Sequence, residues 1–415
     1  MDMNLMADYE KKYDIAADNC RVDEMLNIYC KAMDNMGAKA FDASKDGFWR
    51  HKITLPFWGV WQALLNHDGV RALELIEYLP LAPEAATGIN YYYGLAYYEL
   101  QQWEKSRDHL LLHLKNFRWE KDELAMFYLG NVYSILGNNK VAIDWYNRAL
   151  NIRKSFNECK INKELVKNDK QINYLYPWKS YLNMGKLSFH ELPIFINSRD
   201  RVDVLSDLID WLWSHGYTNV YIIDNDSTYA PLLKYYNEID RKKARVIYLR
   251  ANFGHDALWT SGLLEKLNIS TPYIYTDSDI LPEDTCPDDI IQLFYEILEY
   301  CPFLRKVGFA LKTDDVSYSS SESIIKGDFV HYQIQILPNA YLAGIDTTFA
   351  LYGNHRMYTV DQGVRVRIPG ALARHTPWYY GDNIPEDEKY YIEHASASST
   401  YAEWYKQRKI CDIIN

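Results

Sequence analysis

The sequence predicts two structural classes in one chain: an all-α region over residues 1–155 and an α/β region over residues 191–415, joined by a polar linker or docking segment at 156–190. Three observations lead to this prediction. Glycines recur 35 and 36 residues apart in the first third of the chain. From Leu192 onward, short runs of β-branched and aromatic residues alternate with segments of helical periodicity. Polar clusters follow four of these apolar runs.

Composition limits the classes of function. The chain has 415 residues, 48% of them hydrophobic, which is enough for a sizeable core in two or three domains. Its net charge of −11 argues against nonspecific binding to nucleic acid or to an anionic membrane surface. The N-terminus lacks the pattern of a signal peptide, and no apolar run approaches the ~18 residues that span a bilayer. We therefore expect a cytoplasmic protein without a transmembrane segment, whose six scattered cysteines are reduced.

Internal repeats cover residues 50–153. In each copy a large residue precedes a glycine, at positions 59, 94 and 130, and opens a helix–turn–helix pattern. The best-matched positions are Ser106 and Ala142, twelve residues after the glycine, and Leu110 and Tyr146, sixteen residues after it. Small residues let two helices approach closely, and large ones fill the groove between them. The pattern resembles the tetratricopeptide repeat (TPR), whose period is about 34 residues.

The TPR resemblance implies a concave face that binds peptides, partner proteins or a second copy of the chain. A homodimer through the helical repeats is therefore one expectation, and recruitment of an acceptor or partner is another. The alternative is a scaffold that only completes the fold of its neighbour.

The expected strands of the second region are each followed by a polar group. In order, they are 193–196 with Asn197-Ser198-Arg199, 218–223 with Asp224 to Thr228, 245–249 with Asn252 to His255, and 273–276 with Asp277-Ser278-Asp279. Alternation of strand and helix predicts a mostly parallel sheet with right-handed crossovers. The carboxyl ends of such strands line the binding crevice, so the four polar groups should meet there.

The Asp277-Ser278-Asp279 triplet suits a divalent cation. Paired carboxylates are hard oxygen ligands for Mg²⁺ or Mn²⁺, which could bridge them to the diphosphate of a nucleotide. The alternative is a simple turn, because Asp and Ser both favour turns.

Taken together, the four motifs over residues 190–380 resemble a GT-A type nucleotide-sugar glycosyltransferase of the family 2 group, with a Rossmann-like sheet. In that group the second strand ends in D-[DN]-x-S-T, the third leads into N-x-G-x-x-A, and the fourth ends in D-x-D. The resemblance implies that the donor nucleotide is bound by Asn197, Arg199, Asp224, Asn225, Asn252, Gly254 and Asp277.

The same resemblance implies a metal site. Its ligands would be Asp277, Asp279 and His375, since a late His often completes the site in this group; His375 follows Asp277 by 98 residues (375 − 277). Imidazole beside two carboxylates favours Mn²⁺ over Mg²⁺. A hydrogen-bonded structural histidine is the alternative for His375. Trp378 and Tyr379 could stack on the acceptor sugar or simply pack.

An inverting enzyme of this kind needs a carboxylate base to deprotonate the acceptor hydroxyl. Asp346 is the first candidate, because it is an acid in an otherwise uncharged segment on the acceptor side; it could instead cap a turn at Thr347. Asp361 is the second candidate. The third is the acidic group Asp382, Glu386, Asp387 and Glu388.

One departure from the family pattern concerns phosphate contacts. An Arg or Lys often follows the N-x-G turn, and Trp259 stands near that place here. We expect Arg250 or Arg199 to supply the contact instead.

The sequence thus favours a metal-dependent glycosyltransferase that moves a sugar from a nucleotide-sugar, UDP-sugar by preference, to a hydroxyl of a glycan or protein. The alternative is a non-catalytic TPR scaffold with a nucleotide-binding GT-A-like domain. A nucleotidyltransferase is disfavoured, because Asn197-Ser198-Arg199-Asp200 lacks the glycines of that family's phosphate loop.

Overall fold

The computed structural model describes residues 3–37, 48–52, 54–79, 86–115, 120–173, 177–316, 327–360, 362–381 and 383–395. The chain divides into two compact units. The repeat unit comprises Met1–Tyr181 and Val330–Ala343, and the sheet unit comprises Leu182–Phe329 and Gly344–Asn415. No helix among the described residues is both long and apolar enough to cross a membrane.

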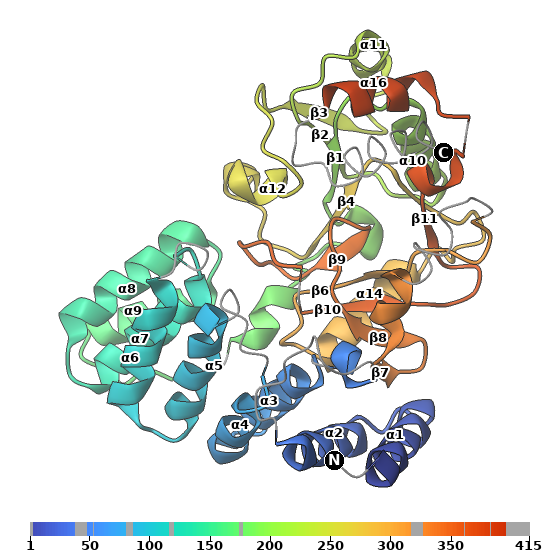
Figure 1. Cartoon of the computed structure of the whole chain (residues 1–415). Helices are drawn as coiled ribbons and strands as arrows, with labels where there is room; N and C mark the ends of the chain where they lie inside the picture. Colours follow the sequence, from blue (N-terminus) through green and yellow to red (C-terminus); the bar gives the residue numbers. More distant parts are fainter. Residues whose placement is uncertain are drawn as a thin grey trace. The chain divides into compact units, whose positions relative to one another are not determined.

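The repeat unit is built from antiparallel helix pairs (Figure 1). Its helices are α1 Met3–Asp18, α2 Val22–Met36, α3 Leu55–Leu65, α4 Gly69–Ile76, α5 Ala86–Glu99, α6 Trp103–Leu114, α7 Glu123–Ile135, α8 Asn139–Ile152 and α9 Asn157–Lys167, with 3-10 turns η1 Trp49–Lys52, η2 Trp178–Leu182 and η4 Val330–Tyr332. The strands β7 Gln335–Leu337 and β8 Ala340–Ala343 pair antiparallel in the same unit. Helix α9 occupies part of the segment that the sequence suggested as a linker.

Within three of the helix pairs, a turn of the same type joins the first helix to the second. His67, Gln101 and Gly137 lie at matched positions between the helices of three pairs and all have positive φ, at 59°, 56° and 78°. A left-handed residue ends the first helix of each pair and reverses the chain. At the next position, the side chains of Asp68 and Asn138 accept the backbone N–H of Arg71 and Val141 and so cap the second helix.

The predicted packing of glycine against a large residue is confirmed in all three pairs. A Cβ atom at Gly130 would lie 2.4 Å from the Tyr146 ring, and one at Gly94 would lie 2.7 Å from Leu110. At Gly59 the same space is filled by Leu26 and, sixteen residues on, by Leu75. The helical part of the repeat unit is therefore a TPR-like repeat array.

The sheet unit alternates strands and helices. Its strands are β1 Ile194–Ser198, β2 Val220–Asp224, β3 Arg245–Tyr248, β4 Tyr273–Asp277, β5 Ile280–Pro282, β6 Lys306–Phe309, β9 Ala350–Tyr352, β10 Gly363–Val366 and β11 Ala373–His375. Its helices are α10 Asp203–Ser214, α11 Ala230–Glu238, α12 Ala257–Thr260, α13 Leu263–Lys266, α14 Ile290–Tyr300 and α16 Glu386–His394, with 3-10 turns η3 Phe189–Glu191 and η5 Thr376–Tyr379.

Within this unit the strands of the main sheet follow the order β3-β2-β1-β4-β9-β6-β10 (Figure 1). The pairs β1–β2, β1–β4, β2–β3 and β6–β10 are parallel, as predicted. Strand β9 is antiparallel to both β4 and β6, so the sheet is mixed and mostly parallel. A small second sheet joins β5 and β11 antiparallel.

The helical segment after the N-x-G turn is divided in two. Ala257 and Leu258 lie in α12, and Leu263 begins α13. The break lies at Gly262, whose φ of 68° is outside the helical range.

Candidate functional site

The register of the parallel strands brings the predicted polar groups to one edge of the sheet. Asn197 on β1 lies opposite Asp277 on β4, and Ser198 lies opposite Asp224 at the end of β2. The chain continues from these strands into the segments that carry Asn225 and Asp279. Strand β3, which leads into the N-x-G turn, pairs with β2 and sets Tyr248 opposite Asp224. All four expected strand ends are therefore neighbours by backbone pairing alone.

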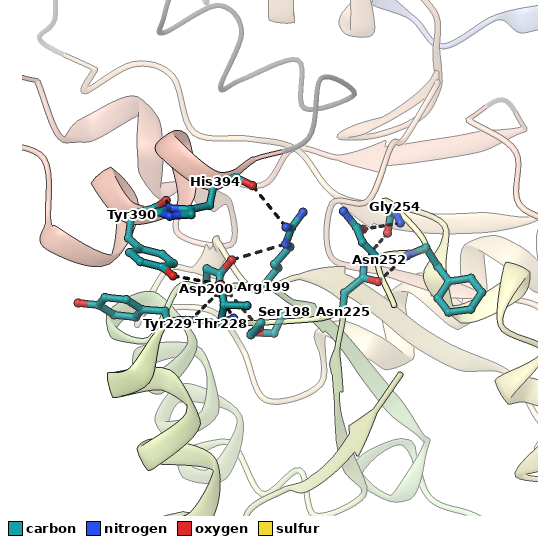
Figure 2. Close-up of polar contacts among 12 residues, drawn as sticks. Ser198, Arg199, Asp200, Asn225, Thr228, Tyr229, Asn252, Gly254, Tyr390 and His394 are labelled. Carbon is teal, nitrogen blue, oxygen red and sulfur yellow. Dashed lines mark hydrogen bonds and ion pairs between the residues drawn. The ribbon is translucent and has the colours of Figure 1, made fainter. Parts of the chain in front are cut away.

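Hydrogen bonds connect all four motifs. The Asn197 amide Nδ2 donates to Oδ1 of Asp277 at 3.2 Å and to the carbonyl of Gly254 at 3.4 Å. The Asn225 amide donates to the same Gly254 carbonyl at 2.8 Å, and its Oδ1 accepts from the N–H of Phe253 at 2.7 Å. Asn252 closes the turn by accepting the N–H of Gly254 at 2.9 Å (Figure 2). We call Asn197, Asp224, Asn225, Asp277 and Asp279 the strand-end cluster.

Asp277 uses both of its carboxylate oxygens. Oδ1 accepts from Asn197, and Oδ2 accepts the hydroxyl of Thr347, whose backbone carbonyl also accepts the N–H of Asp277. Burial raises the pKa of the Asp277 carboxyl well above its ordinary value, and the negative charges of Asp279 and Asp346 add to the rise. A cation or a hydrogen-bond donor from a ligand would therefore favour the charged form.

Asp279 and His375 are brought together by the small sheet. Pairing of β5 with β11 sets His375 opposite Ile280, and Nε2 of His375 lies 3.6 Å from Oδ2 of Asp279. Burial lowers the pKa of the His375 imidazole, an effect that Asp279 partly offsets, so the neutral ring is favoured. Oδ1 of Asp279 is buried and has no hydrogen-bond partner in the structure. A buried carboxylate oxygen of this kind could accept a hydrogen bond or bind a cation.

Only two of the three predicted metal ligands face each other. Asp279 and His375 face each other, whereas both oxygens of Asp277 are taken by Thr347 and Asn197. Over the described ranges, no three His, Cys, Asp or Glu side chains form a group that could hold a metal ion.

Arg201 is a residue of this site that the sequence did not reveal. Its guanidinium forms a bidentate pair with Glu388, at 2.5 and 2.9 Å, and reaches Oδ2 of Asp279 at 3.1 Å. The guanidinium also lies 3.6 Å from the ring centroid of Tyr391. The neighbouring acid Asp387 accepts the N–H groups of residues 202 and 203 at 2.8 and 3.0 Å and thus caps α10.

The acidic group proposed as a third source of the base therefore has other partners. Glu388 pairs with Arg201 and Asp387 caps α10, while Glu386 is exposed. Asp361 and Asp382 lie outside the described residues. No local pattern could have revealed the Arg201–Glu388 pair, because the two residues are 187 positions apart.

Arg199 extends from the end of β1 toward helix α16 (Figure 2). Its Nη2 donates to the carbonyl of His394 at 3.4 Å, and its Nε lies 3.5 Å from a carboxylate oxygen of Asp200. Asp200 accepts the N–H groups of Thr228 and Tyr229 at 2.6 and 2.9 Å, which joins the β1 and β2 ends. Arg250, the other expected phosphate contact, is exposed.

Asp224 ends β2 as a buried acid. Burial raises the pKa of its carboxyl, although hydrogen bonds from Ser227 oppose the rise, and its Oδ1 has no hydrogen-bond partner. Oδ1 of Asn197 is likewise buried without a hydrogen-bond partner. Both oxygens could accept hydrogen bonds from a bound ligand.

Asp346 lies on the loop between β8 and β9, adjacent to Thr347. Asp346 is exposed, whereas Ile345 and Thr347 are buried. Its charge raises the pKa of Asp277, so the candidate base lies near the strand-end cluster.

The remaining predicted residues are aromatic. The ring of Trp378 lies 4.9 Å from that of His375. The hydroxyl of Tyr379 donates to the carbonyl of Lys312 at 2.6 Å and contacts Asp315 at 3.0 Å. Trp259 is partly buried and packs against a hydrophobic core cluster of the sheet unit, and its indole N–H donates to Tyr273 at 2.9 Å.

Comparisons with known proteins identify no family. No family model matches the chain, and no curated protein sequence is similar to it. Among solved structures, the crystal structure of MamA protein is similar over 39% of this chain and 81% of that chain, with 15% sequence identity and a TM-score of 0.31. A similarity at that TM-score adds nothing to the interpretation of either unit.

Proposed function

We propose that the chain is a glycosyltransferase that moves a sugar from a nucleotide-sugar, with a UDP-sugar as the first expectation, to a hydroxyl of a glycan or protein. The observation that carries the proposal is the hydrogen-bonded strand-end cluster. Asn197, Asn225 and Asp277 come from three separate strand ends and are joined by the Gly254 carbonyl and by one another. Each belongs to a motif that resembles the GT-A group.

Donor binding would use the unsatisfied acceptors of this cluster. The buried oxygens of Asp224 and Asn197 can accept the N–H and O–H groups of a nucleoside, and Asn252 and Gly254 form the adjoining turn. Arg199 follows β1, and its guanidinium lies beside Asp200, which joins the β1 and β2 ends. Cationic and amide donors of this kind suit a diphosphate.

A divalent cation, Mn²⁺ or Mg²⁺, fits this site through Asp279 and His375. The unpaired Oδ1 of Asp279 and the neutral imidazole of His375 are suitable donors, and such ions are often bound by one or two protein groups plus substrate phosphates. When bound, the ion supplies positive charge next to the leaving diphosphate. Asp277 would then contact the nucleotide rather than complete a three-residue metal set.

In the proposed transfer step, Asp346 is the general base. Asp346 takes the proton of the acceptor hydroxyl while that oxygen forms a bond to the anomeric carbon. The bond from the anomeric carbon to the phosphate oxygen breaks, and its electron pair leaves with the nucleoside diphosphate. Attack from the side opposite the leaving group inverts the anomeric centre, and general-base catalysis of this kind contributes roughly 10²–10⁴-fold.

The repeat unit is proposed to recruit the acceptor, a partner protein or a second copy of the chain. Arrays of helix pairs present extended surfaces for such contacts. The confirmed glycine packing at Gly94 and Gly130 supports the repeat architecture on which this role depends.

One observation favours a second candidate, a scaffold that binds nucleotide without turnover. Arg201 already places a positive charge on Oδ2 of Asp279, where a catalytic cation would be needed. The two candidates differ in whether sugar is released from a nucleotide-sugar.

The test is hydrolysis of UDP-glucose, UDP-galactose, UDP-N-acetylglucosamine and GDP-mannose in Mn²⁺ by wild type, Asp346→Asn and the exposed control Asp284→Asn. We expect wild type and control to release nucleoside diphosphate from one of the four, and Asp346→Asn to be at least ~100-fold slower with unchanged nucleotide affinity. Full activity in Asp346→Asn would exclude it as the base. Nucleotide binding without turnover of any donor by wild type would favour the scaffold.

A further inference from the structure

The backbone on both sides of Asp346 is held by residues from other segments of the chain. Ile345 donates its N–H to the carbonyl of Val360 at 2.9 Å, and its own carbonyl accepts from the ammonium of Lys306. On the other side, the hydroxyl of Thr347 is bound to Asp277. Asp346 thus projects from a short segment that is fixed at its two neighbours.

A tyrosine contacts the Asp346 carboxylate directly. The hydroxyl of Tyr358 donates to Oδ1 of Asp346. Burial, followed by the charge of Asp346, raises the pKa of the Tyr358 phenol, so it stays protonated and remains a donor at neutral pH. A second tyrosine, Tyr352, reaches only the backbone carbonyl of Asp346, at 3.4 Å.

The position of Tyr358 is itself set by packing. Its ring centroid lies 5.1 Å from that of Trp259 and 5.2 Å from that of His255, both from the segment that follows the N-x-G turn. The ammonium of Lys306, a fully buried residue on β6, lies 5.1 Å from the same ring and bonds the carbonyl of Thr359. Aromatic and cation–π contacts on several sides therefore fix the ring.

From this geometry we infer that Tyr358 is a positioning residue for Asp346. Its hydroxyl holds one carboxylate oxygen and turns the other toward the acceptor hydroxyl. Lys306 supports the arrangement, because a single ammonium bonds the segment of Asp346 and the segment of Tyr358. This inference rests on the proposed function, since it takes Asp346 as the base. Small errors in the placement of a base are costly in rate.

The test compares Tyr358→Phe with the matched variant Tyr352→Phe. Each loses one hydroxyl in the same aromatic cluster, but only Tyr358 touches the carboxylate. With the nucleotide-sugar that wild type hydrolyses, we expect Tyr358→Phe to lower kcat by about 10- to 100-fold and to leave the Kd for UDP within twofold. Tyr352→Phe should lower kcat less than threefold.

A second measurement does not depend on turnover. In crystal structures, wild type should show the Tyr358 hydroxyl within hydrogen-bond distance of the Asp346 carboxylate. Tyr358→Phe should show that carboxylate in a new orientation, with the substituted ring still packed on Trp259. Equal kcat in the two variants, or an unmoved carboxylate, would overturn the positioning role. If Asp346→Asn is inactive while Tyr358→Phe keeps the wild-type kcat, the positioning role is rejected and the proposed function stands.

Discussion

Two buried polar groups, one in each unit of the chain, differ in how their hydrogen bonds are satisfied. In the repeat unit, Asn131 is buried at the centre of a ladder: it donates to Tyr98 at 3.2 Å and accepts from Tyr146 at 2.8 Å and from Asn162 at 3.0 Å. In the sheet unit, the strand-end cluster leaves Oδ1 of Asn197, Asp224 and Asp279 buried without a partner. The protein itself supplies hydrogen bonds to the side chain of Asn131, whereas the three Oδ1 atoms of the strand-end cluster could still accept hydrogen bonds from a ligand.

This difference separates a structural role from a binding role. A neutral, fully paired network rigidifies the packing of helices and holds them in register. A buried carboxylate with an unpaired oxygen costs stability unless a ligand completes it. We therefore assign the Asn131 ladder to folding and propose that the strand-end cluster binds a ligand, so substitutions in the two places should have opposite consequences.

The largest effect on stability is expected in the ladder. Asn131→Ala removes three hydrogen bonds at once and leaves buried hydroxyl and amide groups unsatisfied, so we expect a loss of roughly 3 kcal/mol in the free energy of unfolding. Urea unfolding followed by circular dichroism measures it. The control is Asn35→Ala. Asn35 makes two hydrogen bonds but is exposed, so its substitution should lower the free energy of unfolding by no more than about 0.5 kcal/mol. An equal loss of unfolding free energy in Asn131→Ala and Asn35→Ala would contradict the structural role of the ladder.

A smaller effect of the opposite sign is expected at Asp224. Because burial raises the pKa of its carboxyl in the folded protein, the stability it contributes is full below its ordinary pKa and is lost as pH rises. Asp224→Asn, which cannot ionise, should therefore have a thermal midpoint about 2 °C above that of wild type at pH 7 and equal to it below about pH 4. The same variant should bind UDP more weakly.

Asp226→Asn is the control for this change. It removes the same charge two residues away, at an exposed position whose φ of 67° suits asparagine equally well. Its pH dependence of stability should match that of wild type. An Asp224→Asn protein that is less stable than wild type at pH 7 would contradict the binding role of Asp224.

Much of the architecture could be predicted from the sequence, because it depends on short-range periodicity. Gly130 and Tyr146 are sixteen residues apart in one helix pair, and the structure packs one against the other. The alternation of apolar runs and polar ends likewise predicted the parallel strands that set Asn197 opposite Asp277.

The contacts that complete the site could not be predicted in this way. Arg201 meets Glu388 across 187 residues, and no periodic signal relates them. The insertion of β9 antiparallel between β4 and β6 also has no local signature, yet it brings the Asp346 segment beside Asp277. Tyr358 was missed for the same reason, since a tyrosine in an aromatic-rich chain is assigned to the core until its hydroxyl partner is known.

The central claim is that the strand-end cluster binds a nucleoside diphosphate with a divalent cation at Asp279. Calorimetric titration of UDP and GDP into wild type, Asp279→Ala and the exposed control Asp284→Ala, with Mn²⁺ and with EDTA, tests it most directly. We predict that one nucleotide binds wild type and control in Mn²⁺, and that binding falls at least ~100-fold, or about 2.7 kcal/mol, in EDTA and in Asp279→Ala. Unchanged affinity in Asp279→Ala, or no binding of either nucleotide to folded wild type, would contradict it.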